Sequence, residues 1–248
     1  MTLAEGSSSR SDAPVTLVLF DCDGTLVDSQ HMIVAAMHDA HTTLGLPVPD
    51  RERVLSVVGL SLPETFTVLA AGDRTYPVME MAEAYRSAFM RLRELRPPEP
   101  MFPSAREVLA ALRARDDVVL GMVTGKARRG VARVLQAHDM EGWFTTIQTA
   151  DDAPSKPHPA MVQQAMIEAG IGPAQTVVVG DTSFDMAMAR AAGASALGVS
   201  WGYHSTDELW HAGAQKVVTH FEAVPPAIAD LLSASGGAKA GRDQCATC

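Results

Sequence analysis

A run of apolar, β-prone residues at positions 15–20 ends directly in two acids, Asp21 and Asp23. The run indicates a fully buried strand of a parallel sheet, because such strands read as continuous apolar stretches. In extended backbone, residues two apart point to the same side, so both carboxylates can address one point. Two acids at the end of a buried strand are costly unless a cation or a proton lies between them. This stretch therefore predicts a site of chemistry.

The rest of the chain divides into two patterns of secondary structure. Residues 29–102 carry helical patterns only. We expect one helix that is capped by Ser29 and has an apolar pattern from Ile33 to Leu44, and further helices over 50–58, 63–70 and 78–95. Four prolines in the segment 97–103 then indicate a linker. From 103 onward, expected helices alternate with expected strands at 118–123, 145–148, 176–179, 196–199 and 217–218.

This alternation predicts an α/β fold with a doubly wound parallel sheet, which binds ligands at the carboxyl ends of its strands. The opening strand belongs with this half of the chain. We therefore expect a Rossmann-like core of residues 15–28 and 103–232, interrupted after its first strand by a small all-helical domain at 29–102. The last expected helix covers 222–232, and the ends of the chain, 1–14 and 233–248, are expected to be disordered tails because they lack an apolar period.

Composition narrows the classes of partner. The net charge of −9 disfavours nucleic acid and anionic membranes as partners. No apolar run approaches the ~18 residues that span a bilayer, and the start of the chain does not read as a signal peptide. Three cysteines fit a reducing setting, and Cys245 with Cys248 forms only an isolated CxxC near the end. We expect a cytoplasmic protein with a small-molecule substrate, and the sequence leaves monomer and homodimer open.

Three further groups of polar residues fall where expected strands or their loops end. One offers a hydroxyl and a glycine-exposed backbone N–H before a helix, which suits an oxyanion. The second offers a lysine in a proline-rich segment, and the third offers two acids four positions apart. These residues are Thr124 with Gly125, Lys156, and Asp181 with Asp185.

Each group alone has a simple structural reading, as a helix cap, a turn residue or a solvated charge. Together they bring four acids, a threonine and a lysine to one edge of one sheet. Carboxylates are hard ligands of the kind Mg²⁺ takes beside a substrate phosphate. Lys156, Thr124 and exposed N–H groups would balance the charge of that phosphate. The candidate metal ligands are Asp21, Asp23, Asp181 and Asp185.

The ordered set Asp21-x-Asp23-Gly24-Thr25, Thr124-Gly125, Lys156-Pro157 and Gly180-Asp181-x-x-x-Asp185 resembles the four motifs of the haloacid dehalogenase-like superfamily of hydrolases. The resemblance covers the core, about two thirds of the chain, and the inserted helices resemble that family's cap. Asp28-Ser29 and the segment 155–159 are similar to its phosphoglycolate phosphatase-like branch. The resemblance implies a Mg²⁺-dependent phosphatase acting on a small phosphomonoester, with phosphoglycolate as the first guess.

The resemblance also implies roles for the catalytic acids. Asp21 is expected to be the nucleophile that forms an aspartyl-phosphate, and Asp23 to protonate the leaving oxygen and then activate water. Mg²⁺ is expected to bind Asp21, the backbone carbonyl of Asp23, and Asp181, with Asp185 close by or acting through water.

Phosphate binding and catalysis are also assigned to Thr124, Gly125 and Lys156 by the same resemblance. The hydroxyl of Thr124 and the N–H of Gly125 would bind phosphoryl oxygens, and Lys156 would neutralise charge on Asp21 and the phosphate.

Two alternatives remain. A phosphomutase of the same superfamily would use the same motifs on a sugar phosphate, and a non-catalytic regulator would bind a phosphometabolite on the same fold. Asp23 disfavours a dehalogenase, whose equivalent residue is not an acid.

Additional cations are weaker candidates. Arg51, Arg53, Arg86 and Arg91 of the insertion could contact a second anionic group on the substrate. Lys126, Arg128 and Arg129 could add positive potential near Thr124, although a solvated helix face explains them as well.

Overall fold

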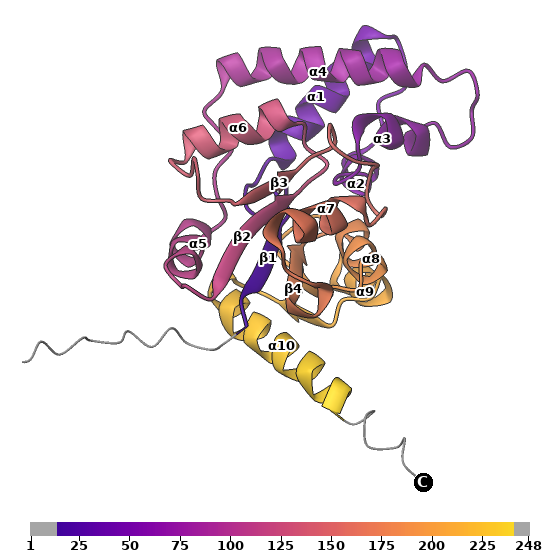
Figure 1. Ribbon diagram of the computed structural model, residues 1–248. Coiled ribbons are helices and arrows are strands. Elements are labelled where there is room, and N and C mark those ends of the chain that lie inside the picture. The colour runs from indigo at the N-terminus through magenta and orange to yellow at the C-terminus, as the bar shows by residue number, and fades with distance from the viewer. Residues whose placement is uncertain (1–13, 241–248) are drawn as a thin grey trace, which may run out of the picture.

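The structure is a computed structural model that describes residues 14–240. Its centre is one sheet of six parallel strands in the order β3-β2-β1-β4-β5-β6 (Figure 1). The strands are β1 (Thr16–Phe20), β2 (Val118–Val123), β3 (Thr146–Gln148), β4 (Thr176–Gly180), β5 (Ser195–Val199) and β6 (Lys216–Val218). The expected doubly wound parallel sheet is confirmed.

β1 lies in the middle of this sheet and pairs with β2 on one side and β4 on the other. All five of its residues are buried, which explains the continuous apolar sequence. After β1 the chain builds outward through β2 to β3 and then returns to build β4, β5 and β6. The strand order therefore reverses beside β1, and ligands of doubly wound sheets bind at such a point.

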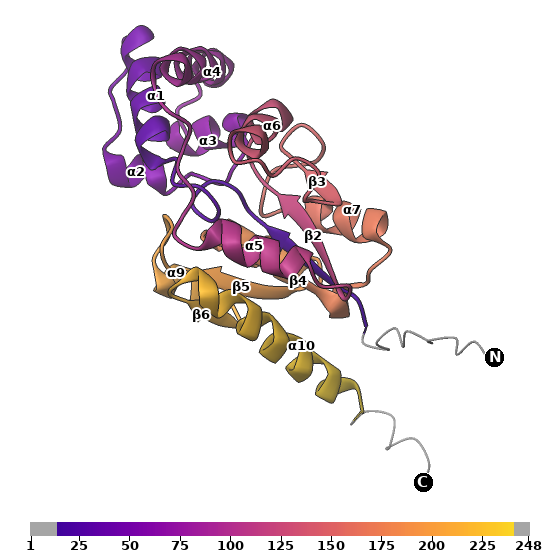
Figure 2. The ribbon, with the colours of Figure 1, turned by 90° about the vertical axis from the view of Figure 1, so that its left-hand side faces the viewer.

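Helices cover both faces of the sheet, and alternate side chains of β1 pack against the helices on opposite faces. Val18 and Phe20 pack with α5 (Ala105–Arg113), α6 (Arg128–Ala137) and α10 (Val224–Ala240). Leu17 and Leu19 pack on the other face, with α7 (Ala160–Ala169), α8 (Ser183–Ala191) and α9 (Thr206–His211). Figure 2 shows α5 and α10 together on one side of the sheet. Short 3-10 turns, Pro173–Gln175 and Phe221–Ala223, precede β4 and α10.

The segment between β1 and β2 contributes four helices above the carboxyl ends of the strands (Figures 1 and 2). They are α1 (Gln30–Thr43), α2 (Arg51–Leu55), α3 (Leu62–Leu69) and α4 (Val78–Leu95). Their buried side chains form a hydrophobic cluster separate from the two clusters of the sheet, with Phe66 fully buried in it. We interpret residues 29–102 as a cap on the core and call them the cap below.

Two chain segments, 26–28 and 100–102, join the cap to the core, and they lie side by side. The N–H of Asp28 donates to the carbonyl of Pro100 at 2.8 Å, and the N–H of Phe102 donates to the carbonyl of Leu26 at 3.0 Å. Val27 and Met101 form an antiparallel bridge between them. The proline-rich linker expected at this place is therefore paired with the chain that leaves the site.

Two helices differ from the sequence expectation. α2 ends at Leu55 rather than at position 58, and the chain then turns to a glycine, Gly59, with φ of +99°. α10 continues to Ala240, although residues from 233 onward were expected to be disordered. The stretch has several alanines, the best helix formers, and no proline ends it. Residues 1–13 and 241–248, with the pair Cys245 and Cys248, lie outside the described residues.

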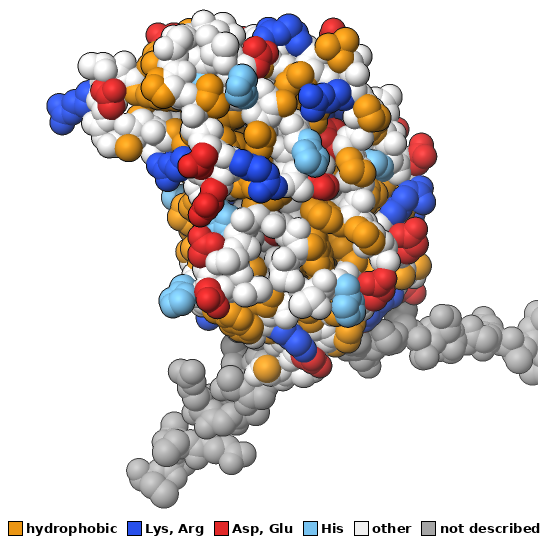
Figure 3. Space-filling view, turned by 180° about the vertical axis from the view of Figure 1, so that it is seen from behind, with side chains coloured by type: hydrophobic (Ala, Val, Ile, Leu, Met, Phe, Trp, Pro, Cys, Tyr) orange, Lys and Arg blue, Asp and Glu red, His pale blue; other side chains and the backbone are white. Residues whose placement is uncertain are grey.

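The described helices include none that is long and apolar enough to cross a membrane. The face opposite to the view of Figure 1 carries Lys and Arg side chains interspersed with Asp and Glu (Figure 3). On that face the charge is mixed rather than gathered into one field of a single sign.

The separate cluster of the cap yields a test of its packing. Phe66→Ala is expected to lower the free energy of unfolding by about 3–5 kcal/mol, because it empties a fully enclosed site. Val68→Ala on the same helix is the control, since Val68 is 40% exposed, and its cost is expected to stay below about 1 kcal/mol. Urea unfolding of both variants measures the difference. Equal costs would contradict the packing described here.

Candidate active site

The turn after β1 fixes the place of Asp21 and Asp23. The N–H groups of Leu26 and Val27 both donate to the carbonyl of Cys22, which closes the turn. Gly24 has φ of +86°, and a Cβ at this position would lie 2.3 Å from Oδ2 of Asp181. Only glycine fits here, because both the backbone angle and the space exclude a side chain. The turn thus brings the end of β1 against the end of β4.

Three buried carboxylates meet at this edge of the sheet. Oxygen atoms of Asp21, Asp181 and Asp185 all lie within 4.8 Å of one another. Asp21 and Asp181 follow β1 and β4, whereas Asp185 lies in the first turn of α8, where it forms a capping box with Thr182. The sequence predicted that these three acids would meet.

Lys156 enters this cluster from the loop between β3 and α7. Its Nζ lies 2.6 Å from Oδ1 of Asp185 and 2.9 Å from Oδ1 of Asp21, and the side chain is fully buried. Oδ2 of Asp185 accepts from the N–H and the hydroxyl of Thr182, at 3.1 and 2.6 Å. Asp181 accepts from the hydroxyl of Thr25 at 2.8 Å and from the N–H of Tyr203 at 2.9 Å. Oδ2 of Asp21, by contrast, accepts no hydrogen bond from any described residue.

The charges of this cluster perturb one another. Burial raises the pKa of the Asp21 carboxyl to about 6, the Lys156 ammonium opposes this rise, and the Asp185 carboxylate adds to it. Burial, and then the carboxylates of Asp21 and Asp185, raise the pKa of Asp181 well above its usual range. Burial disfavours the ammonium of Lys156, but Asp185 and Asp21 outweigh it and raise its pKa. The raised pKa values of Asp21 and Asp181 mean that Lys156 alone does not stabilise all three acids in their ionised form.

The cluster fits a divalent cation. If all three carboxylates are ionised, they exceed the one ammonium by two negative charges, which a divalent cation would neutralise. Oδ2 of Asp21 is buried and without a hydrogen-bond donor among the described residues, as a metal ligand would be. Oδ1 of Asp185 is held by the Lys156 ammonium, whereas Asp181 has only neutral donors, so Asp185 fits an outer position better than direct coordination. Hard oxygen ligands of this kind suit Mg²⁺.

Asp23 does not join the three-acid cluster, although its carboxylate and that of Asp21 were expected to address one point. Its carboxylate lies outside the three-acid cluster and receives Lys126, whose Nζ is 2.7 and 3.0 Å from its two oxygens. Burial lowers the pKa of the Lys126 ammonium, but Asp23 more than compensates, and the pKa is raised overall. The same Nζ lies 5.4 Å from the ring centroid of Phe89 on α4. Lys126 was expected only to add diffuse potential, and the structure makes it the direct partner of Asp23.

Thr124 and Gly125 lie at the end of β2, where the core touches the cap. The N–H of Thr124 donates to the carbonyl of Gln148 at 3.0 Å, which fixes it beside β3. A Cβ on Gly125 would lie 2.3 Å from the carbonyl oxygen of Gly59, so a loop of the cap rests directly on this residue. The N–H of Ser61, in the same loop, donates to the hydroxyl of Ser155 at 2.8 Å. The cap is therefore seated on two of the predicted motifs.

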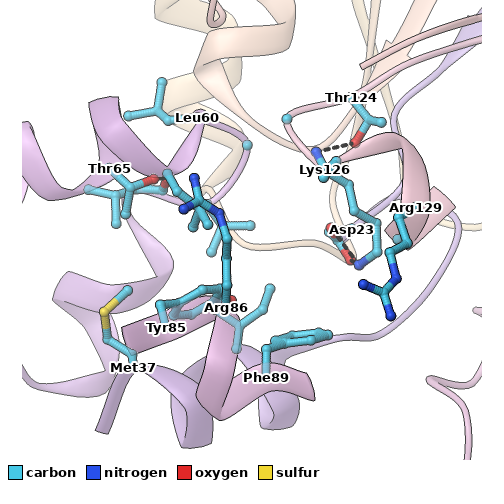
Figure 4. A pocket seen from close by; sticks show the side chains of 18 of the residues that line it. Asp23, Met37, Leu60, Thr65, Tyr85, Arg86, Phe89, Thr124, Lys126 and Arg129 are labelled. Carbon is cyan, nitrogen blue, oxygen red and sulfur yellow. Dashed lines mark hydrogen bonds and ion pairs between the residues drawn. The ribbon is translucent and has the colours of Figure 1, made fainter. Parts of the chain in front are cut away.

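A cavity of about 270 Å³ lies between the core and the cap. Asp21, Asp23, Thr124 and Gly125 line its core side, and side chains of α1, α2 and α4 line its cap side. Figure 4 shows Lys126 reaching Asp23, with Arg129 beside them and Arg86 near Tyr85 on the cap side. Lys156, Asp181 and Asp185 lie behind Asp21 and do not line this space.

The cap arginines are divided by this geometry. Arg86 lines the cavity, as expected of a candidate. Arg51 donates to Gln30, Arg53 to the carbonyl of Val68, and Arg91 to Asp39, and none of the three lines the cavity.

The loop after β5 is a part of the site that sequence reasoning missed. Trp201 donates from Nε1 to the carbonyl of Thr25 at 3.1 Å. The hydroxyl of Tyr203 lies 3.0 Å from the hydroxyl of Ser29, where the cap begins. The backbone N–H of Tyr203 donates a hydrogen bond to Oδ2 of Asp181. A Cβ on Gly202 would lie 2.2 Å from the side chain of Asp181. The only signal was an aromatic-Gly-aromatic segment after an expected strand, which is too common to single out.

A family model described as haloacid dehalogenase-like hydrolase matches residues 18–199, and the chain belongs to this family. The Probable phosphatase IndB of Dickeya dadantii (strain 3937) is 36% identical over 221 residues, which cover 88% of this chain and 96% of that protein. Phosphoglycolate phosphatase of Escherichia coli (strain K12) is 33% identical over 207 residues, or 75% of this chain and 82% of that protein.

A solved structure of a hydrolase from Pseudomonas syringae has a TM-score of 0.73 and 26% identity, covering 83% of this chain and 94% of that chain. These likenesses confirm the expected family and its phosphoglycolate phosphatase-like branch. The chain is a hydrolase of the phosphatase kind within that family.

The raised pKa of Asp21 sets a pH dependence of stability. The folded protein holds this proton up to about pH 6, whereas the ordinary value is 3.8. The metal-free protein therefore loses free energy of unfolding as pH rises from about 4 to about 6, by at most about 3 kcal/mol from this group. Asp21→Asn is expected to remove this part of the loss and to leave the part that the raised pKa of Asp181 contributes, which urea unfolding in chelator at pH 4.5 and pH 7 measures.

The control for this experiment is Asp39→Asn, which removes an exposed carboxylate of α1. It should keep the wild-type dependence on pH. Identical pH profiles for wild type and Asp21→Asn would contradict the raised pKa.

Proposed function

We propose that this protein is a Mg²⁺-dependent phosphatase that hydrolyses a small phosphomonoester through an aspartyl-phosphate on Asp21. The observation that best supports this is the environment of the Asp21 carboxylate. It is buried at one end of a cavity, is paired with Lys156 through Oδ1, and leaves Oδ2 without a hydrogen-bond donor among the described residues. Because Asp21 lines the cavity, one oxygen of its carboxylate can attack a phosphorus atom that lies there while the other remains available to a metal.

The first step of the proposed reaction joins Asp21 to the phosphoryl group. A bond forms between a carboxylate oxygen of Asp21 and phosphorus, and the bond from phosphorus to the leaving oxygen breaks. Asp23 gives a proton to that leaving oxygen. The hydroxyl of Thr124 and the N–H of Gly125 are placed at the cavity to bind phosphoryl oxygens.

The second step returns Asp21 to its starting state. Asp23, now ionised, takes a proton from a water molecule that attacks phosphorus, and inorganic phosphate leaves as the bond to Asp21 breaks. The different partners of the two carboxylates support this division of work. Both residues line the cavity, but Asp21 belongs to the buried acid cluster, whereas Asp23 pairs with Lys126.

We assign the metal to Asp21 and Asp181, with the backbone carbonyl of Asp23, and place Asp185 in an outer position where it orients Lys156. Bound Mg²⁺ supplies positive charge that offsets the acid cluster and the substrate phosphate. Phosphoglycolate is the reference substrate, because relatives carry its name. A phosphomutase would use the same residues and would return the phosphoryl group to a sugar intermediate instead of to water.

The two acids are separable by substitution. Asp21→Asn is expected to abolish release of inorganic phosphate from phosphomonoesters, because an amide cannot form the intermediate. Asp23→Asn is expected to lower kcat by about 10²–10⁴-fold through loss of acid–base catalysis. Asp39→Asn is the control and should retain activity. Full turnover by Asp21→Asn would refute the mechanism, and isomerisation of a sugar phosphate without phosphate release would favour the mutase.

The metal can be tested without turnover. Mg²⁺ at 100 times its Kd is expected to stabilise the folded protein by about 2.7 kcal/mol, which a rise in Tm measures. Asp181→Asn should lose most of this rise, whereas Asp207→Asn, an exposed acid on α9, should keep it. A matching rise in Asp181→Asn, or undiminished activity in chelator, would exclude the proposed metal site.

A further inference from the structure

The cavity is larger and more apolar than a two-carbon acid requires. Its volume of about 270 Å³ approaches the ~300 Å³ at which pockets for drug-sized ligands begin. Phosphoglycolate carries only two carbons beyond its phosphate. The cap wall is formed largely by apolar and aromatic side chains, namely Ile33, Met37, Val54, Val57, Val58, Leu60, Leu62, Tyr85 and Phe89. Such a wall binds an apolar body through the hydrophobic effect.

Two arginines stand where this cavity opens between α4 and α6. Arg129 and Arg133 are four residues apart on α6 and so lie on one face of that helix. A second hollow of about 200 Å³ is lined by both of them and by Met90, Arg93 and Glu94. The two hollows share Met90, Arg93, Arg129 and Arg133, so the space runs from the catalytic acids to the arginines.

Charge at this end of the space is unbalanced. Arg93 is paired with Glu99 at 3.5 Å and stacks over Phe89. Within residues 14–240, neither Arg129 nor Arg133 has an ion pair or a side-chain hydrogen bond, and Glu94 pairs with neither of them. The cavity thus ends at two guanidinium groups without an acidic partner.

The neighbouring cations behave differently. Lys126 also lines the cavity, but Asp23 neutralises it. Arg128, next to Arg129 in sequence, turns away from the cavity and pairs with Asp152 at 2.7 Å. A merely solvated helix face would give all of these arginines similar surroundings. Arg129 and Arg133 are set apart because they face the substrate space and lack a counterion in the described chain.

We infer that the natural substrate is a phosphomonoester whose leaving group has an apolar body and ends in a second anionic group, a carboxylate or a phosphate, that Arg129 and Arg133 bind. This inference rests on the proposed function. The phosphoryl group to be transferred lies at Asp21, the apolar body lies against the cap wall, and the second anion lies at α6. Arginine suits this place because its planar fork matches both carboxylate and phosphate.

Matched probes test the inference. One pair is 4-carboxyphenyl phosphate with its neutral isostere 4-carbamoylphenyl phosphate, and a longer pair is 4-(2-carboxyethyl)phenyl phosphate with its amide. For at least one pair, kcat/KM of the wild type is expected to favour the acid by about tenfold, the value of one modest charged hydrogen bond. The double variant R129Q/R133Q is expected to bring the ratio of acid to amide close to one.

Arg91→Gln is the control variant, because Arg91 lies on α4 outside the cavity and pairs with Asp39. It should keep the wild-type ratio. An equal rate for acid and amide in both pairs, or a preference that survives in R129Q/R133Q, overturns the inference and leaves the proposed function standing. Hydrolysis of phosphoglycolate without any of the aryl esters also overturns it alone. If no phosphomonoester releases phosphate with Mg²⁺, the proposed function fails and the inference falls with it.

Discussion

The ion pairs of Lys156 with Asp21 and Asp185 are the interaction on which the site depends. All three side chains are buried, so removing Lys156 would leave two buried carboxylates without their counterion, and breaking a buried ion pair in this way typically costs about 3–5 kcal/mol. The three residues come from the end of β1, the loop after β3 and the first turn of α8. Thr182 holds Asp185 in turn by capping α8. A substitution that moves the loop after β3 or the first turn of α8 therefore alters the position of the Lys156 ammonium and, with it, the environment of the Asp21 carboxylate.

Much of the fold and of the acid cluster could be predicted from the sequence, because both depend on apolar periodicity and on the common edge of a parallel sheet. β2 and α4 begin and end where their apolar patterns predict, because packing against a large cluster enforces the period. Asp21 and Asp181 meet because parallel strands end at a common edge. The pairing of Lys126 with Asp23 was not predicted, because it depends on the course of the loops that follow β1 and β2.

The contact between the cap and the core could not be predicted from the pattern of residues along the chain. Gly59 and Gly125 are far apart in the chain, yet a Cβ on Gly125 would lie 2.3 Å from the carbonyl oxygen of Gly59, so Gly125 could not carry a side chain without a shift. The hydrogen bond from Ser61 to Ser155 crosses the same seam. No local propensity records such a contact, because it follows from two separately folded surfaces fitting together. The cavity and its lining are products of that fit.

The pairing of β1 with β4 and the loop after β5 has a consequence for how the chain reaches this state. The hydrogen bonds from Thr25 to Asp181 and from Ser29 to Tyr203 span 156 and 174 residues. Closing loops of this length is slow, and a strand in the middle of the sheet keeps an open edge until its late partner arrives. During synthesis, Asp21 is therefore made early, whereas Asp181 and Tyr203, which hold the turn after it, are made much later. Until β4 has been made, β1 presents an unpaired edge of the kind that pairs readily with other chains.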